Sequence, residues 1–325
     1  MTAIKEKSKL IISNPQELIF GSAPNPVKCG RDLLIGSGEV YPEINFTLPS
    51  MIIEENSFDE IRKEATEEKP YFLFVIKDAT GNEVQKITTE AKAGINKVVW
   101  NYRYSTTTPI KLKEIKPGRY GSFDVGQLAL PGTYSVTMYL DDNGKVAQLA
   151  EPKSFEIDLL NNNSLAAVDK KALLAFQKEV AELRRSVQGT SKLMGEVKDR
   201  LAHIKKAIQT FPSVDVSLLE EVQKIQAELE EVSIMLNGDN AIAKYEFETY
   251  PSIMDRIETV VYGLWNSTSA PTTTSKDNIT IAKNEYEPVL TMVQQSVKKV
   301  EALEKKLAIT PSPYTPGRNS EWKEE

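Results

Sequence analysis

The strongest constraint in this sequence is a run of apolar residues spaced three and four apart through residues 173–211. Side chains at this spacing form one stripe along an α-helix, and so long a stripe has to be covered by other helices. The same spacing returns in residues 219–236, 253–264 and 282–307. Because the connections between these segments are short, neighbouring helices should run antiparallel. The sequence therefore predicts an antiparallel bundle of long α-helices over residues 161–310.

The sequence before residue 161 has a different period. Apolar and polar residues alternate in residues 71–77 and again in residues 133–140, as in strands that bury one face. The segment Asp141-Asp-Asn-Gly144 is typical of a hairpin turn, because Asn-Gly tolerates the positive φ that such turns need. Several short strands separated by turns favour an Ig-like antiparallel β-sandwich over residues 70–160. The predicted fold class is thus α+β, with two domains.

The two ends of the chain show neither period. Residues 1–69 are rich in Pro, Gly and Asn and are interpreted as an extended lead-in or linker, with a candidate first strand at Glu43–Leu48. Within this lead-in, the charged residues 51–69 fit either a loop or a short helix. Residues 311–325 form a Pro-rich, charged tail that we expect to lie along the surface.

Charge and hydropathy exclude two classes of partner. The net charge is -6 and is divided evenly between the two halves, so no basic field exists to bind nucleic acid. No apolar stretch approaches the roughly 20 residues needed to cross a bilayer, and no membrane insertion is expected. The first 20 residues lack the apolar core of a secretory signal. The chain is therefore expected to be either cytoplasmic or a mature or truncated piece of an exported protein.

Residues capable of catalysis are sparse. His203 is the only histidine and lies between two positions of the apolar stripe, which predicts a solvated location. Cys29 is the only cysteine, so it can form no intrachain disulfide, and we interpret it as an incidental thiol. Carboxylate pairs such as Glu220-Glu221 fit solvated helix faces better than a hydrolytic cleft. We accordingly expect no catalytic, cofactor-binding or metal-binding residues, no cofactor, and no enzymatic activity of the chain itself.

Aromatic residues offer the candidate contact sites. Trp100, Tyr134 and Tyr139 fit the core of the predicted sandwich. Three tyrosines near predicted loops could instead contact a partner or a glycan: Tyr102, Tyr104 and Tyr120. The long apolar stripes leave two alternatives open, since they are either covered within the chain, which we favour, or partly exposed to another subunit.

Two blocks of sequence carry a family resemblance. Ala93–Arg103, followed by Leu130–Val136, resembles an Ig-like domain of secreted bacterial proteins. Tyr250–Ile257, together with Ala270–Thr273 and Pro313–Arg318, resembles the C-terminal region of secreted bacterial sortilin-like, BNR-repeat β-propeller proteins that are often labelled glycosyl hydrolases. The resemblance covers roughly residues 70–325 and does not include a propeller.

The resemblance implies a role as well as a fold. Together with the predicted sandwich, the extended helices and the lack of convergent reactive residues, it indicates a non-catalytic structural or protein-interaction module. The resemblance implies that this module is part of a larger exported bacterial protein or complex at the periplasm, cell surface or outside the cell. Its partner would be another protein or an adjoining propeller domain. The alternative that the resemblance leaves open is an accessory, carbohydrate-contacting domain of a BNR-repeat glycoside hydrolase.

Overall fold

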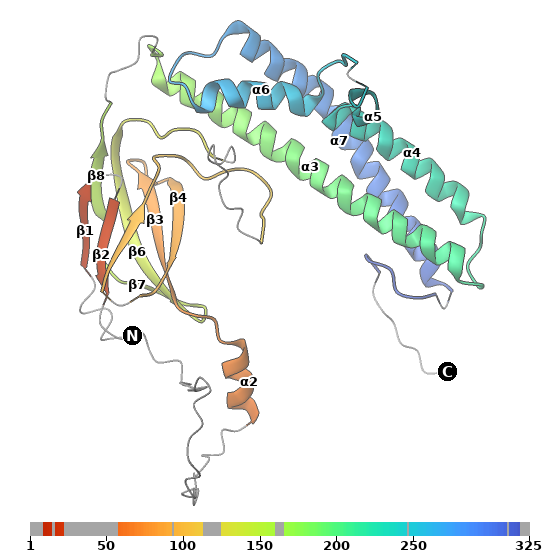
Figure 1. Cartoon of the computed structure of the whole chain (residues 1–325), viewed down its shortest axis with the longest axis horizontal. Helices are drawn as coiled ribbons and strands as arrows, with labels where there is room; N and C mark the ends of the chain where they lie inside the picture. The colour runs from red at the N-terminus through yellow and green to blue at the C-terminus, as the bar shows by residue number, and fades with distance from the viewer. Residues whose placement is uncertain are drawn as a thin grey trace, which may run out of the picture. The chain divides into compact units, whose positions relative to one another are not determined.

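The chain divides into two units, a sheet unit and a helical unit (Figure 1). The sheet unit comprises residues 1–103 and 131–160, and the helical unit comprises residues 104–130 and 161–325. The structure is a computed structural model that describes residues 9–14, 17–22, 58–92, 94–112, 125–159, 166–245, 247–310 and 312–318.

The strands that the structure describes in the sheet unit form two antiparallel sheets. The three-stranded sheet has the order β1 (Lys9–Asn14), β2 (Glu17–Ser22) and β5 (Gly94–Val99). The five-stranded sheet has the order β4 (Glu83–Glu90), β3 (Tyr71–Asp78), β6 (Gly132–Asp142) and β7 (Lys145–Gln148), and β8 (Lys153–Ile157) pairs with another part of β6. A short helix, α2 (Phe58–Thr66), precedes β3.

Strand β3 shows how the alternating pattern builds this core. Phe72, Phe74 and Ile76 are fully buried on one face of the strand. The register places Phe74 between Ile87 of β4 and Met138 of β6. Burying each such side chain contributes about 1.5–3 kcal/mol relative to leaving it in water.

Trp100, directly after β5, is the largest fully buried side chain of the sheet unit. Its ring meets Tyr134 of β6 and Phe155 of β8 edge-on, at centroid distances of 5.5 and 6.0 Å. Its indole N–H donates a 2.9 Å hydrogen bond to the carbonyl oxygen of Arg103. The residue at the end of one sheet is therefore packed against two strands of the other.

Several sequence predictions can be compared with these strands. The prediction of an antiparallel sheet combined with helices is confirmed. The more specific prediction, that the sheets form an Ig-like sandwich, is not confirmed. The Asn-Gly turn joins β6 to β7, with φ of 53° at Asn143 and 80° at Gly144. The β1–β2 hairpin lies in the segment that the sequence predicted to be an extended lead-in, and it was not predicted. The candidate strand at Glu43–Leu48 lies outside the described residues.

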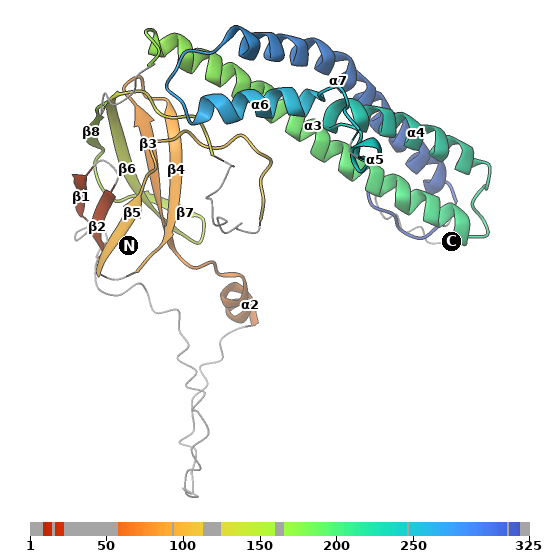
Figure 2. The same ribbon diagram turned by 45° about the horizontal axis from the view of Figure 1, so that its top comes forward.

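The described residues of the helical unit form four long helices and one short one. They are α3 (Lys170–Thr210), α4 (Leu218–Asn237), α5 (Asn240–Ala243), α6 (Ile253–Trp265) and α7 (Thr273–Ala308). Helix α3 packs against α4, α6 and α7, as Figure 2 shows. The stripe residues Val187, Leu201 and Ile204 of α3 are buried in one hydrophobic cluster with residues of the other long helices. Among the described residues, no helix combines the length and the apolar content that crossing a bilayer requires.

Local sequence signals position the ends of these helices. Asp169 accepts a hydrogen bond from the backbone N–H of Ala172 and so caps α3. Ser252 and Asp255 form a reciprocal capping box at the start of α6. Helix α3 continues through Gly189 without interruption, because its packed face outweighs a propensity cost of about 1 kcal/mol.

We expect Trp100→Ala to destabilise the sheet unit by about 3–5 kcal/mol, since the change leaves a large cavity among aromatic rings. Urea unfolding followed by near-ultraviolet circular dichroism measures this loss. Ile95→Ala on β5 is the matched control, because the Ile95 side chain is exposed and its loss should change stability by under about 0.5 kcal/mol. Equal effects of the two substitutions would contradict the assigned core.

Candidate functional site

A polypeptide segment that we call the strap, residues 104–112, belongs to the helical unit. The ammonium group of Lys178 on α3 lies 5.1 Å from the centre of the Tyr104 ring, within the range of a cation–π contact. The backbone N–H of Tyr104 donates a 2.9 Å hydrogen bond to the carbonyl oxygen of Gln127. Val125 packs against the apolar core of the helices. These contacts anchor the strap to the helical unit.

Gly126 makes this anchoring possible. A Cβ atom at residue 126 would lie 2.1 Å from the carbonyl oxygen of Tyr104, a separation that atoms cannot adopt. Only glycine therefore allows the two backbone segments to approach so closely.

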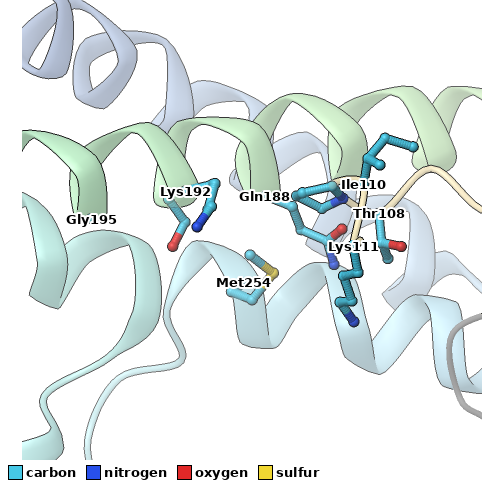
Figure 3. A pocket seen from close by; sticks show the side chains of 9 residues that line it. Thr108, Ile110, Lys111, Gln188, Lys192, Gly195 and Met254 are labelled. Atoms are coloured by element: carbon cyan, nitrogen blue, oxygen red, sulfur yellow. The ribbon is translucent and has the colours of Figure 1, made fainter. Parts of the chain in front are cut away.

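A groove lies between the strap and helices α3 and α6, and we call it the strap groove (Figure 3). Its volume is about 630 Å³, within the range of small-molecule sites. The side chains that characterise its lining are Thr108, Ile110, Lys111, Gln188, Lys192 and Met254. The groove thus combines two cationic groups, a carboxamide and an apolar wall. An adjoining hollow shares Lys192 and adds Arg185 and Glu196.

A polar network behind the groove orients Gln188. The buried Arg184 guanidinium donates two hydrogen bonds to the Glu258 carboxylate, of 2.8 Å from Nε and 3.2 Å from Nη2. Gln188 Nε2 donates a 3.2 Å hydrogen bond to Oε1 of the same carboxylate. Because an ionised carboxylate only accepts hydrogen bonds, the Gln188 amide nitrogen must face Glu258 and its oxygen must face away. That oxygen, Oε1, is buried and has no hydrogen-bond partner among the described residues.

Groups that could hold a metal are not assembled in the described part of the chain. There, no cluster of three or more His, Cys, Asp and Glu side chains has the spacing of a metal site. His203 is exposed on α3, and its Nδ1 lies 2.8 Å from the carbonyl oxygen of Asp199 on the same helix. Cys29 lies outside the described residues.

The tyrosines predicted as contact sites are not brought together. Tyr102 lies in the sheet unit, half-buried, with its ring centre 5.5 Å from that of Trp100. Burial raises the pKa of the Tyr102 hydroxyl. Tyr104 lies in the helical unit beneath Lys178, and Tyr120 is outside the described residues. Their role as contacts to a partner or glycan stays a prediction.

The residues of the polar network were not predicted from the sequence. Arg184 follows Val180 by four residues and therefore lies on the buried stripe of α3, where a charged side chain needs a partner. This placement was a usable signal for a buried ion pair. The sequence does not identify the partner, because Glu258 comes from a helix 74 residues away.

Comparison with known proteins gives one finding. A family model described as methanol-cobalamin methyltransferase B subunit matches residues 4–73, about a fifth of the chain. The described elements within the match are β1, β2, α2 and the first residues of β3. Comparisons with curated proteins and with solved structures gave no match.

This match corrects several predictions from the sequence. The resemblance to sortilin-like, BNR-repeat proteins is wrong, and with it the predicted secreted protein-binding module and the accessory glycoside hydrolase domain. The prediction that the chain has no enzymatic role is wrong as well, because the matching family is a methyltransferase subunit. A protein partner is consistent with a subunit, whereas the adjoining propeller has no support.

The family description names cobalamin, and the described residues do not fit it as a resident group. The described imidazole, His203, is exposed and is hydrogen-bonded to its own helix rather than directed into a cavity. The strap groove is lined by lysines, an amide and a thioether, and its lining includes no imidazole that could bind the cobalt. No reaction step is therefore assigned to a cobalamin held by these residues.

We expect Gly126→Ala to loosen the strap and to lower stability by about 1–3 kcal/mol, because the new methyl group forces the backbone of Tyr104 to move. Hydrogen exchange should show faster exchange of the Tyr104 amide. Gly263→Ala on α6 is the matched control, since open space surrounds Gly263 and alanine should raise stability by about 0.5–1 kcal/mol. Unchanged protection of Tyr104 in Gly126→Ala would refute this anchoring.

Proposed function

We propose that this chain is a subunit of a methyl-transfer complex similar to the methanol-cobalamin methyltransferase B subunit. The observation that carries the proposal is the family match over residues 4–73. The family description supplies the reaction class, in which a methyl group passes between methanol and cobalamin. Because the described residues do not fit a resident cobalamin, the proposal treats cobalamin as a substrate that is free in solution or carried by a partner.

The short helix α2 supports a partner contact within the matched segment. Phe58 and Ile61 lie three residues apart on α2 and are 82% and 44% exposed, and no residue of this helix is buried. Apolar side chains at this spacing form one face of a helix, and such faces bind apolar grooves of other proteins. We assign this face to the protein partner that a subunit requires.

The reaction itself provides the first test. The full chain is incubated with methanol and reduced cobalamin, alone and with the proteins that co-purify with it, and methylated cobalamin is followed by its visible spectrum. The proposal expects methylation that depends on both the chain and methanol. If the co-purifying proteins methylate cobalamin equally well without the chain, the assignment fails.

The partner contact has its own prediction. Phe58→Ser with Ile61→Ser should abolish co-purification of the partner while leaving thermal unfolding unchanged, because neither side chain contributes to the core. Val216→Ser, at an exposed apolar residue of the helical unit, is the matched control and should retain the partner. If the α2 variant still retained the partner, α2 would not be part of the interface.

We also propose that the two sheets form an immunoglobulin-like sandwich. The packing of Trp100 against Tyr134 and Phe155 supports this, since it connects the end of β5 to β6 and β8 of the other sheet. A sandwich requires such side chains between the inner faces of its sheets.

A further inference from the structure

The long helices that the structure describes in the helical unit form three columns. Helices α3 and α7 each form one column, whereas α4 and α6 divide the third between them. Figures 1 and 2 show α6 along one half of α3 and α4 along the other. The hydrogen bonds agree, because Gln177 of α3 bonds to Leu264 of α6, and Lys198 of α3 bonds to Glu230 of α4. The third column is therefore interrupted midway along α3, at residues 238–252.

A proline lies in α7 at the level of this interruption. Ser191 of α3 donates a 3.2 Å hydrogen bond to Asn237, the last residue of α4, which fixes the level of the interruption on α3. One residue earlier on α3, the hydroxyl oxygens of Thr190 and Tyr286 lie 2.8 Å apart, and Pro288 follows two residues later inside α7. Proline has no N–H to donate to the carbonyl group four residues earlier, so α7 lacks one of its backbone hydrogen bonds there.

Two glycines lie in α3 at the same level. Gly189 and Gly195 are inside the helix, although alanine is the better helix former. Packing does not require glycine at either position, because no described atom outside the helix's own backbone lies within 4 Å of a Cβ atom placed there. Glycine gives the backbone more conformational freedom than any other residue. These two positions therefore make α3 easier to bend.

We propose that the helical unit bends at this level, which we call the hinge. The hinge comprises residues 189–195 of α3, residues 238–252 and Pro288 of α7. Bends in long helices occur at proline and glycine, and here such residues and a break between helices meet across all three columns. The near half, with α6, can therefore turn against the far half, with α4. The hinge lies outside the matched residues 4–73 and does not depend on the proposed function.

Bending also changes the strap groove. The strap is attached to the near half, because the ring of Tyr104 contacts Lys178 in the first part of α3. The wall of the groove that α3 provides extends across the hinge, from Gln188 to Gly195. A turn of the far half moves Gly195 relative to the strap, while Gln188 keeps its place beside it. The angle of the hinge thus sets the width of the groove.

Distances between spin labels on the full chain test the hinge. Cys29 is the only native cysteine, so Cys29→Ser allows pairs of cysteines to be introduced and labelled. Tyr262→Cys with Glu231→Cys spans the hinge from exposed positions of α6 and α4, and Glu231→Cys with Ala302→Cys is the control pair within the far half. Packed helices lie about 10 Å apart, so a bend of about 20° moves the labels by roughly 3 Å. Pulsed electron paramagnetic resonance should show a distance distribution wider by about this amount for the pair that spans the hinge.

A variant that stiffens the hinge provides the second measurement. It carries Gly189→Ala, Gly195→Ala and Pro288→Ala, and its thermal midpoint should rise because alanine favours the helix. The distribution of the pair that spans the hinge should narrow to the width of the control pair. Gly263→Ala is the matched control, since it adds alanine to α6 away from the hinge, where open space surrounds the new methyl group. It should leave the distribution wide.

A label on the strap tests the link to the groove. Ile110 is an exposed residue of the strap, and Ile110→Cys is paired in turn with Tyr262→Cys of the near half and with Glu231→Cys of the far half. The first pair should give a narrow distribution and the second a wide one, because the strap moves with the near half.

Two results would overturn the hinge. One is a distribution across the hinge that is as narrow as that of the control pair, since the two halves would then form one rigid body. The other is a distribution that stays wide in the folded triple-alanine variant, since the motion would then not arise at these residues. Equal widths for the two strap pairs would show that the hinge does not control the groove.

Discussion

Burial of the apolar stripe of α3 is the interaction on which the helical unit depends. The helix is 41 residues long, and its stripe is covered in turn by α4, α6 and α7. Few isolated helices of ordinary composition are stable in water, so the stripe and its covering helices stabilise one another. Ion pairs such as Arg200–Glu304 lie at the edge of this core, where the cost of removing the charges from water offsets much of their attraction.

The orientation of α3 also determines where the strap groove forms. With its apolar stripe turned toward the other helices, α3 places Gln188 and Lys192 on a flank that the strap approaches. Arg184 lies between the apolar core and the polar flank of α3: it is buried like a core residue, yet it is hydrogen-bonded to Glu258. Packing of the helices and these hydrogen bonds hold the polar side chains of the groove in place.

The correction of the family assignment has a physical reason. The blocks that resembled an Ig-like domain of secreted proteins consist largely of turn and strand signals, such as Pro131-Gly132 at the start of β6 and a tryptophan after β5. Any antiparallel sheet needs residues of this kind at its turns and in its core. They therefore indicate a type of local structure more strongly than membership of a family. Function depends on specific sites rather than on such folds. The family match falls on a different segment, residues 4–73, most of which was interpreted as an extended lead-in or linker with a candidate first strand.

Apolar residues recur every two residues in the strands and every three to four residues in the helices. This spacing predicts much of the architecture, because it follows directly from the backbone geometry of strands and helices. Strands β3 and β6, the Asn143-Gly144 turn and the four long helices were all predictable from the sequence. The hairpin of β1 and β2 was not, since its strands are short and lie among turn-forming residues.

The candidate site depends on contacts that no local pattern records. Gly126 matters only because Tyr104 passes beside it, and Gln188 matters only because Glu258, 70 residues away, holds its amide nitrogen. The sequence by itself determined which segments become strands and helices and which faces they bury. Only the tertiary structure decided which polar side chains meet, because hydrogen bonds between distant residues form after those faces have packed.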